Sequence, residues 1–427
     1  MTQEGPLPPT PPHGWLSALL PVGVPDLAAA RRRRRRSALI VLPVLLLIAA
    51  AIAWNQTHRS RSHRAPSRPP QPYAPLPPAF TGDSTLLHDT VIAPTLDTPI
   101  PPGKNVIWCS SFELAWNRLR NDVFKAPVRL AGAEAVTDRL NASQAVEADL
   151  SPESVYAAAG LTSEGIADRI RREMAERFPG HPAPQFSTDA VLAAYAYMQL
   201  AAKFTLAFLD NEDKFIFTDA RGKKTAVTSF GLPPHGPRVP ESLPEQVKLL
   251  YAKEPEKGKQ TYVDSYAVCT EFAIDPCRTT TPYQIVVAVV PPQATLAGTL
   301  GDVASKIAAE PPNSGREFSV TDVLLIPNVS CRITHHFREL EGPDKRLLDT
   351  PFKGLYLATA QQDIDFRLDR SGAALVSTST VEYASKPTRY ACDRPFLIYM
   401  KKLDADRPFF ALWVDNAELL SKPSPGS

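Results

Sequence analysis

The stretches DRPFLIYMKK at residues 393–402 and PFFALWV at residues 408–414 set how the second half of the chain folds. Both are rich in aromatic and branched aliphatic residues, which are enriched in β-strands. A proline stands near the start of each, where its missing N–H disturbs a sheet least. They predict two neighbouring strands, at residues 395–402 and 408–414, in a sheet that extends back along the chain.

More strands precede this pair, because the spacing of apolar residues falls towards two from residue 204 onwards. The expected strands cover residues 204–209, 214–218, 225–230, 265–275, 283–290, 319–326, 355–360, 363–368 and 373–383. The unbroken apolar run at residues 283–290 predicts a central strand. Residues 296–309 predict a helix between these strands.

The first half of the folded region predicts helices. Ser110 and Glu113 have the spacing of a capping box. Further helices are expected from Pro152 to a stop at Gly160, over residues 166–178 and over residues 187–198. Helices followed by strands predict an α+β domain, with a helical first half and large antiparallel or mixed sheets in the second half. The apolar stripes of the helices indicate packing, and we expect no cofactor.

The charges of the 427 residues are segregated. The whole chain carries 47 Lys+Arg and 45 Asp+Glu, a net charge of +2. Residues 1–68 hold ten arginines and two acids, a net of +8, which leaves residues 69–427 at about −6. Nucleic-acid binding needs clusters of Lys and Arg that this acidic region lacks, so we expect no nucleic-acid partner for it.

Residues 37–54 read SALIVLPVLLLIAAAIAW and predict a transmembrane helix. Eighteen uncharged residues span roughly 27 Å as a helix, enough for a hydrocarbon core. Six adjacent arginines, Arg31 to Arg36, precede it and four scattered arginines follow, so the positive-inside rule places the amino terminus in the cytoplasm. The alternatives are a buried core helix and a signal peptide cleaved after the A-x-A sequence at residues 51–53.

This signal-anchor reading divides the chain into four parts. Residues 1–36 form a disordered cytoplasmic tail rich in Pro and Arg, whose arginines contact anionic lipid headgroups; the alternatives are a polyproline ligand in the tail and a nuclear-import or nucleic-acid patch at the arginines. Residues 37–54 cross the membrane. Residues 55–102 form a proline-rich linker, and residues 103–422 form the extracytoplasmic domain.

Cysteines, histidines and sequence motifs give little sign of catalysis. The sequence holds no nucleophile elbow, phosphate-binding loop, dinucleotide fingerprint or zinc-protease helix. The five cysteines leave at least one unpaired; Cys269 and Cys277 either pair or stay as buried thiols. Cys109 at a helix start is a weak nucleophile candidate, and the pair His335 and His336 is a weak metal-ligand candidate. We expect core packing and a solvated polar patch instead, with no metal.

From residue 283 to its end, the chain resembles the carboxy-terminal half of the serpins. In that family a central strand is followed by a helix, a strand with a proline, a short helix, a strand leading to a small-residue hinge, an exposed reactive loop, an Asp-Arg-Pro-Phe-Leu sequence and a closing hairpin. This chain keeps that order over residues 283–414. The residues that match the closing sequence are Asp393, Arg394, Pro395, Phe396 and Leu397.

The resemblance implies a hinge at Gly372, Ala373 and Ala374, and a scissile position near Lys386 and Pro387. Inhibitory serpins insert the cleaved loop into a sheet as a new strand. Here Arg370-Ser371 replaces the acidic pair that precedes the hinge, and Leu375-Val376 stands where the family prefers alanine. A Lys-Pro bond is also a poor substrate for trypsin-like proteases. These departures predict a serpin-like scaffold that does not trap proteases.

Two classes of function remain. The first is a membrane-anchored, serpin-like binding or structural module without enzymatic activity, whose partner is a protease or another protein. An active protease inhibitor is an alternative within the same class. The second class is a membrane-tethered enzyme with a dispersed site. Both classes share the predicted anchor and the export of the carboxy-terminal domain.

The predicted anchor is tested by membrane fractionation of the full-length protein. Because eighteen apolar residues insert stably in a bilayer, we expect the protein to remain with membranes through washes with high salt and alkaline carbonate. A protease added outside intact cells should reach residues 70–427. Release by carbonate would exclude the anchor, and protection of the carboxy-terminal domain would reverse its orientation.

Overall fold

The computed structural model describes residues 77–150, 152–186, 192–201, 204–237, 239–255, 258–277, 283–310, 318–348, 352–371, 387–403 and 405–424. All belong to the second of the two units of the chain, residues 73–427. The predicted membrane helix at residues 37–54 and its flanking arginines lie outside these residues. Across the ranges that are described, no helix has the length and apolar character needed to cross a membrane.

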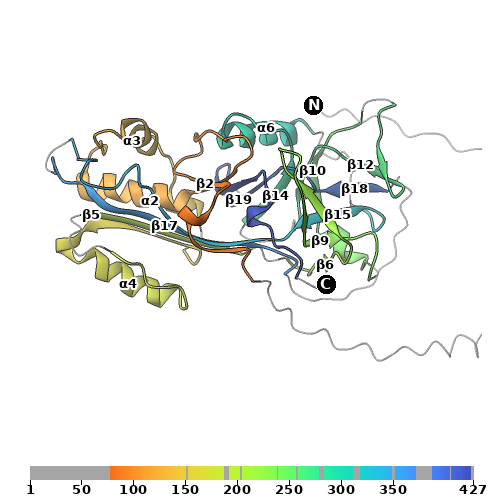
Figure 1. The fold of residues 1–427 in the computed structure, drawn as a ribbon, viewed down its shortest axis with the longest axis horizontal. Coiled ribbons are helices and arrows are strands. Elements are labelled where there is room, and N and C mark those ends of the chain that lie inside the picture. Colours follow the sequence, from red (N-terminus) through yellow and green to blue (C-terminus); the bar gives the residue numbers. More distant parts are fainter. Residues whose placement is uncertain are drawn as a thin grey trace, which may run out of the picture. The chain divides into compact units, whose positions relative to one another are not determined.

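A five-stranded sheet forms one end of this unit (Figure 1). Its order is β1 (Phe80–Asp83), β16 (Val329–His336), β17 (Leu357–Leu368), β5 (Leu192–Ala201) and β4 (Val155–Leu161). The two longest strands, β17 and β5, lie parallel and adjacent in its centre. Antiparallel neighbours, β16 and β4, flank this parallel pair.

Helices cover both faces of the five-stranded sheet. Alternate residues of β5 point to opposite sides, so Tyr195 and Tyr197 pack against α4 (Ile166–Arg177), and Ala194 and Ala196 join the main core with α2 (Ser110–Arg118). Figure 1 shows α2 and α4 on opposite sides of β5 and β17. The centre of this sheet is therefore buried on both faces.

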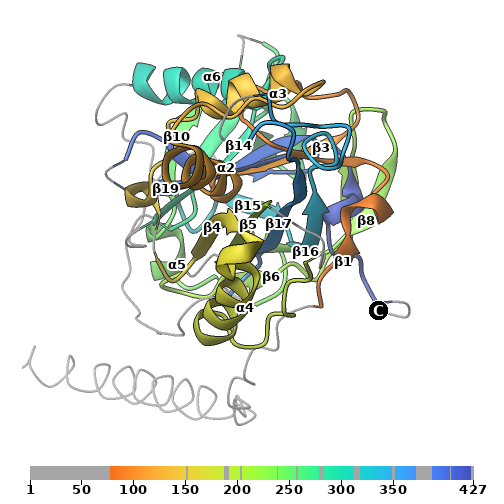
Figure 2. The same ribbon diagram turned by 90° about the vertical axis from the view of Figure 1, so that its left-hand side faces the viewer.

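A seven-stranded sheet holds the strands with which the sequence analysis began. Its order is β10 (Lys248–Ala252), β13 (Phe272–Asp275), β14 (Tyr283–Val289), β19 (Phe396–Lys402), β20 (Pro408–Val414), β3 (Asn105–Cys109) and β2 (Thr90–Ala93). The antiparallel pair of β19 and β20 confirms the two predicted strands, and β14 is interior, as expected. The helix α6 (Leu296–Ala309) lies on one face of this sheet (Figure 2). Its residues Leu296 and Val303 belong to the same buried apolar cluster as Trp413 of β20.

A six-stranded sheet and a separate hairpin complete the unit. The sheet order is β11 (Tyr262–Val263), β12 (Tyr266–Val268), β18 (Thr388–Ala391), β15 (Val323–Pro327), β9 (Ser229–Leu232) and β6 (Leu209–Asp210). The hairpin pairs β7 (Phe215–Thr218) with β8 (Lys224–Val227). Short helices α3 (Glu134–Asn141) and α5 (Ser242–Glu245) lie in connections.

The prediction of a helical first half was wrong at two of its four helices. The predicted helix from Pro152 to Gly160 is the strand β4, and the described part of the one at residues 187–198 belongs to β5. Both segments are rich in alanine, which favours helices in isolation. Burial in a sheet with neighbours on both faces overrides that preference, and a strand buried on both faces shows no clear alternation. The predicted α+β class is confirmed, as is the helix at residues 166–178.

The predicted capping box at Ser110 was also wrong. Cys109 is the residue at the helix cap, and no side chain caps α2. Glu113 instead accepts hydrogen bonds from Trp108 Nε1, at 2.8 Å, and from Ser143 Oγ. Burial raises the pKa of Glu113, while these two hydrogen bonds act in the opposite direction. The bonds hold the carboxyl in place within the core.

The described unit begins inside the segment predicted as linker. Residues 77–102 supply β1, which lies parallel to β16, and β2, which lies parallel to β3. Part of the proline-rich stretch is thus built into the edges of two sheets.

Gly231 in β9 tests the packing of the six-stranded sheet. Its φ is +144°, and a Cβ there would lie 2.1 Å from the carbonyl oxygen of Leu324 on β15. Because both the backbone conformation and the contact oppose a side chain, we expect Gly231→Ala to lower the free energy of unfolding by about 3 kcal/mol in urea denaturation.

The matched control is Gly301→Ala in α6, where nothing lies within 4 Å of the added Cβ. Alanine should stabilise that helix by about 0.5–1 kcal/mol. A Gly231→Ala variant as stable as the unmodified protein would show that β9 and β15 are not paired in this register.

Candidate functional site

The residues predicted at the hinge and the scissile position bracket a segment that lies largely outside the described residues. Gly372, Ala373, Ala374 and Lys386 are among those not described, whereas Pro387 is described and directly precedes β18. The described chain ends at Ser371 on one side and resumes at Pro387 on the other. The geometry of these two ends forms the candidate site.

At the hinge end, the chain beyond β17 stays attached to the chain that follows β5. The N–H of Phe204 donates to the carbonyl of Ser371 at 3.1 Å, and the N–H of Phe208 donates to the carbonyl of Arg370 at 3.1 Å. The Asp369 carboxylate accepts from the backbone N–H of Ser371 at 2.9 Å. Main-chain contacts thus reach the last described residue before Gly372.

Ion pairs hold the chain just before the hinge. Arg367 Nε lies 3.2 Å from Asp369 Oδ2, and Arg370 pairs with Asp210 at the end of β6. Arg370, which replaces part of the acidic pair of the family pattern, therefore ties the hinge end to the six-stranded sheet.

Within the parallel pair, a buried carboxylate joins β17 to its neighbours. Asp363 is 4% exposed, and its Oδ2 accepts from the hydroxyl of Tyr195 on β5 at 2.9 Å. Gln361 Nε2 donates to both Asp363 oxygens at 3.0 and 3.1 Å, and His181 Nε2 lies 3.3 Å from Oδ2. Burial and the neighbouring Asp363 raise the pKa of Tyr195, so its hydroxyl stays protonated and can donate. We call Asp363, Tyr195, Gln361 and His181 the sheet clamp.

At the other end, β18 is held on both sides. It pairs parallel with β12 and parallel with β15. The N–H of Ala267 donates to the carbonyl of Pro387 at 3.0 Å, and Asp322 Oδ1 accepts from the N–H of Thr388 at 2.8 Å. Burial raises the pKa of Asp322, while its bonds to backbone N–H groups favour the ionised form. Pro387 thus lies at a fixed position beside a sheet.

Residues 393–397, which match the closing sequence of the serpins, pack and form hydrogen bonds within the fold. Phe396 and Leu397 are fully buried on opposite faces of β19. Arg394 Nε lies 3.0 Å from Asp393 Oδ1, and the carbonyl of Asp393 accepts from the N–H of Thr218. Pro395 leads directly into β19. This motif therefore connects the hairpin β7–β8 to the seven-stranded sheet.

The weak catalytic and metal candidates are also placed by the structure. Cys109 is buried beside Cys331, and burial raises the pKa of both thiols, that of Cys331 to about 12. Such an environment opposes a reactive thiolate. His336 pairs with Glu341 at 2.9 Å, and His335 Nδ1 lies 2.7 Å from Ser84 Oγ. Among the described residues, no group of His, Cys, Asp and Glu side chains is arranged to hold a metal ion. All five cysteines are buried thiols, and none is part of a disulfide.

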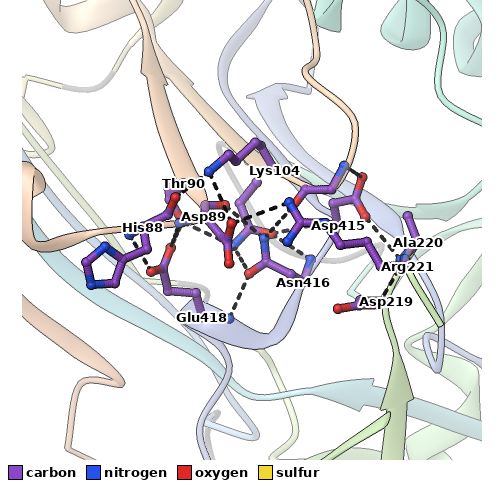
Figure 3. A network of polar contacts seen from close by, with 12 residues as sticks. His88, Asp89, Thr90, Lys104, Asp219, Ala220, Arg221, Asp415, Asn416 and Glu418 are labelled. Carbon is purple, nitrogen blue, oxygen red and sulfur yellow. Dashed lines mark hydrogen bonds and ion pairs between the residues drawn. The ribbon is translucent and has the colours of Figure 1, made fainter. Parts of the chain in front are cut away.

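A polar network near the carboxy terminus was not predicted (Figure 3). Glu418 accepts from the N–H groups of His88 and Asp89, at 2.7 and 3.0 Å, and Asn416 donates to the carbonyls of Asp89 and Gly103. Asp415 accepts from the N–H of Gly103 and the N–H of Ala220, each at 3.2 Å. We call residues 415–418 the terminal latch. It joins β2, β3 and the β7–β8 turn, and single polar residues spread over the chain gave no motif that could reveal it.

The comparisons with known proteins concern the fold. No family model and no curated protein sequence matches the chain. Among solved structures it is similar to the thermophilic serpin tengpin (12% identity, 74% of this chain and 90% of that chain covered, TM-score 0.45). It is also similar to mouse protein-Z dependent protease inhibitor (12%, 73% and 91%, TM-score 0.44) and to Serpin48 of the insect Tenebrio molitor (10%, 73% and 92%, TM-score 0.42).

The fold is serpin-like. The expected elements occur in the expected order, β14, α6, β15 with Pro327, β17, β19 and β20. β16 and β18, which were not predicted, lie among them. The expected short helix before β17 is missing from the described residues, where turns stand instead. With identities of 10–12% and TM-scores below 0.5, these similarities give no information about the activity or the partner of this chain.

The His335 site makes stability depend on pH. Burial, together with the neighbouring His336, lowers the pKa of His335 from 6.5 to about 4. Below pH 6.5 the unfolded chain binds a proton that the folded chain does not, so stability falls as the pH drops from 6.5 towards 4. For this residue we expect a loss of about 2 kcal/mol between pH 7 and pH 5, measured by urea unfolding.

A His335→Gln variant should lose most of this pH dependence, while His88→Gln, at an exposed histidine, should keep it. Equal pH profiles for His335→Gln and the unmodified protein would show that His335 is not buried as a neutral group.

Proposed function

We propose that the chain is a single-pass membrane protein whose extracytoplasmic domain is a binding or structural module that does not trap proteases. The anchor follows from residues 37–54 and the arginines before them. The domain has no catalytic role in this proposal, and its partner is a protein. The serpin-like fold gives the scaffold, and the two ends of residues 372–386 give the argument about trapping.

Trapping requires that the segment after β17 enter the five-stranded sheet. One edge of β17 is already paired with β16, so a strand that turns back along β17 must lie between β17 and β5. The inserted strand would run antiparallel to both β17 and β5, so two antiparallel pairings would replace one parallel pairing. To admit it, the paired residues of β5 and β17, from Leu192 with Leu357 to Ala201 with Arg367, must separate.

The observation that supports a non-trapping domain most directly is the pair of main-chain bonds from Phe204 and Phe208 to residues 371 and 370. Insertion begins where the loop leaves β17, and these bonds close the gap there. The pairing of Arg370 with Asp210 reinforces the same point.

The sheet clamp opposes separation further along the pair. Opening β5 from β17 breaks the bond of Tyr195 to Asp363 and leaves a buried carboxylate with fewer donors. Losing a hydrogen bond to a buried charged group costs on the order of 1.5–3 kcal/mol. The larger side chains of Leu375 and Val376 add a packing cost of about 1–3 kcal/mol if they enter a slot suited to alanine.

Cleavage of the loop tests this proposal. We expect that cutting the full chain between residues 377 and 386 with elastase leaves its melting temperature nearly unchanged, because no strand is gained. Incubation with a panel of serine proteases should give simple cleavage or no reaction on denaturing gels.

A control variant, Leu375→Ala with Val376→Ala, separates the two obstacles. If the closed hinge end is sufficient, this variant also keeps its melting temperature after cleavage. A rise of tens of degrees after cleavage of the unmodified chain, or a protease adduct that survives detergent, would show a working inhibitor.

A further inference from the structure

A groove of about 540 Å³ lies beside the fixed end of β18. Its described wall comes from three stretches of the chain: residues 233–237 with Val239 and Glu241, residues 264–266 around the β11–β12 turn, and residues 320–323; Pro387 completes it. Prolines 233, 234 and 237 give one stretch a stiff backbone, and Tyr266 adds an aromatic side chain. The groove is thus built mostly of residues whose conformations are restricted.

Exposed apolar side chains gather at the groove and at the strand next to its turn. Of the seven large hydrophobic residues that the described chain exposes, three are Tyr262, Val263 and Val320. Val320 is 43% exposed and lines the groove, while Tyr262 and Val263 form β11 just before the turn. Since β11 ends the order of the six-stranded sheet, its outer edge has no partner strand among the described residues. Exposed apolar groups in a cluster are typical of binding surfaces.

The turn in the groove wall has an unfavourable backbone conformation. Asp264 and Ser265 have φ values of 48° and 72°, and they are two of the three residues other than glycine with positive φ in the described part of the chain. Two-residue turns of this kind normally contain Asn or Gly. Residues held in such conformations cluster at ligand sites, because the surrounding structure must maintain them.

The described groove wall has an acidic character. Its described residues include three carboxylates, those of Glu241, Asp264 and Asp322. His235 pairs with Asp213 at 2.9 Å. Asp322 is already occupied by the N–H groups of Ser319 and Thr388, so Asp264, on the exposed turn, is the carboxylate best placed to meet a ligand. A cationic ligand with apolar groups complements this wall.

We propose that this groove binds an extended segment of a protein partner in which apolar residues alternate with lysine or arginine. The apolar side chains contact Val320, Tyr266 and Pro387, and the cationic groups face Asp264. Alternation suits a segment in extended conformation, because successive side chains point to opposite sides. This inference rests on the proposed role as a binding module and names the surface and the chemistry of the partner.

The experiment uses the full-length chain in detergent micelles and a fluorescein-labelled peptide, acetyl-(Val-Arg)5-amide, followed by fluorescence anisotropy. Two peptides of the same length are controls: acetyl-(Ser-Arg)5-amide keeps the charge without the apolar groups, and acetyl-(Val-Glu)5-amide reverses the charge. We expect the Val-Arg peptide to bind at least about ten-fold more tightly than either control.

Two variants locate the binding. Val320→Ser and Asp264→Asn should each weaken binding of the Val-Arg peptide at least about five-fold, and asparagine is suited to the positive φ at position 264. Leu403→Ser and Asp344→Asn, at an exposed leucine and an exposed carboxylate elsewhere, are matched controls and should bind as the unmodified chain does.

Equal binding of the Ser-Arg peptide would reduce the effect to charge and overturn the proposal, as would unchanged binding by both groove variants. If the peptide does not bind and Val320→Ser instead abolishes self-association in sedimentation, the occupant is a second copy of the chain and the proposal is wrong. These results are independent of loop cleavage: a gain in melting temperature on cleavage contradicts the non-trapping role alone, and a loss of peptide binding contradicts the groove alone.

Discussion

The parallel pairing of β5 with β17 is the constraint on which the rest of the described domain depends. Both strands are buried on both faces, so the pair separates one core beneath α2 from another beneath α4. Opening the pair would expose both cores at once, together with the Asp363 carboxylate. The segments that follow β5 and β17 remain joined by main-chain hydrogen bonds as far as Ser371. In this structure the sheet is therefore closed between β5 and β17.

Sequence patterns predicted the second half of the fold better than the first. The helix at residues 296–309 and the strand at 408–414 were found with their observed bounds, because each shows a clear period and clear end signals. β4 and β5 were missed because their alanines favour helices in isolation, and the reason for small side chains there is the close packing of layers on each side of the sheet. Propensity acts locally, whereas this packing involves residues far apart in the chain.

The candidate site was predictable only in part, for a related reason. The resemblance to serpins placed the predicted hinge after the strand that the structure shows as β17, but the hinge residues lie outside the described residues. It did not indicate β18. It did not reveal Asp363 or Asp322, because an isolated acid within an apolar stretch forms no motif. Their roles come from partners on other elements: Tyr195 for Asp363 and Thr388 for Asp322. No sequence pattern marked Asp264 either, because its proposed role in binding depends on its backbone angle and its place in the groove wall.

The terminal latch has a consequence for the order in which the protein is made. Residues 415–418 are synthesised long after β2, β3 and the β7–β8 turn, yet they hold these earlier segments. The seven-stranded sheet also places β3 beside β20, the last of the described strands. β2 can pair with β3 as soon as both are made, but the other edge of β3 stays open until β20 is synthesised, and unpaired strand edges are prone to aggregate. We therefore expect protection of this edge during synthesis to favour folding, and deletion of residues 415–427 to remove contacts that secure the first strands of the sheet.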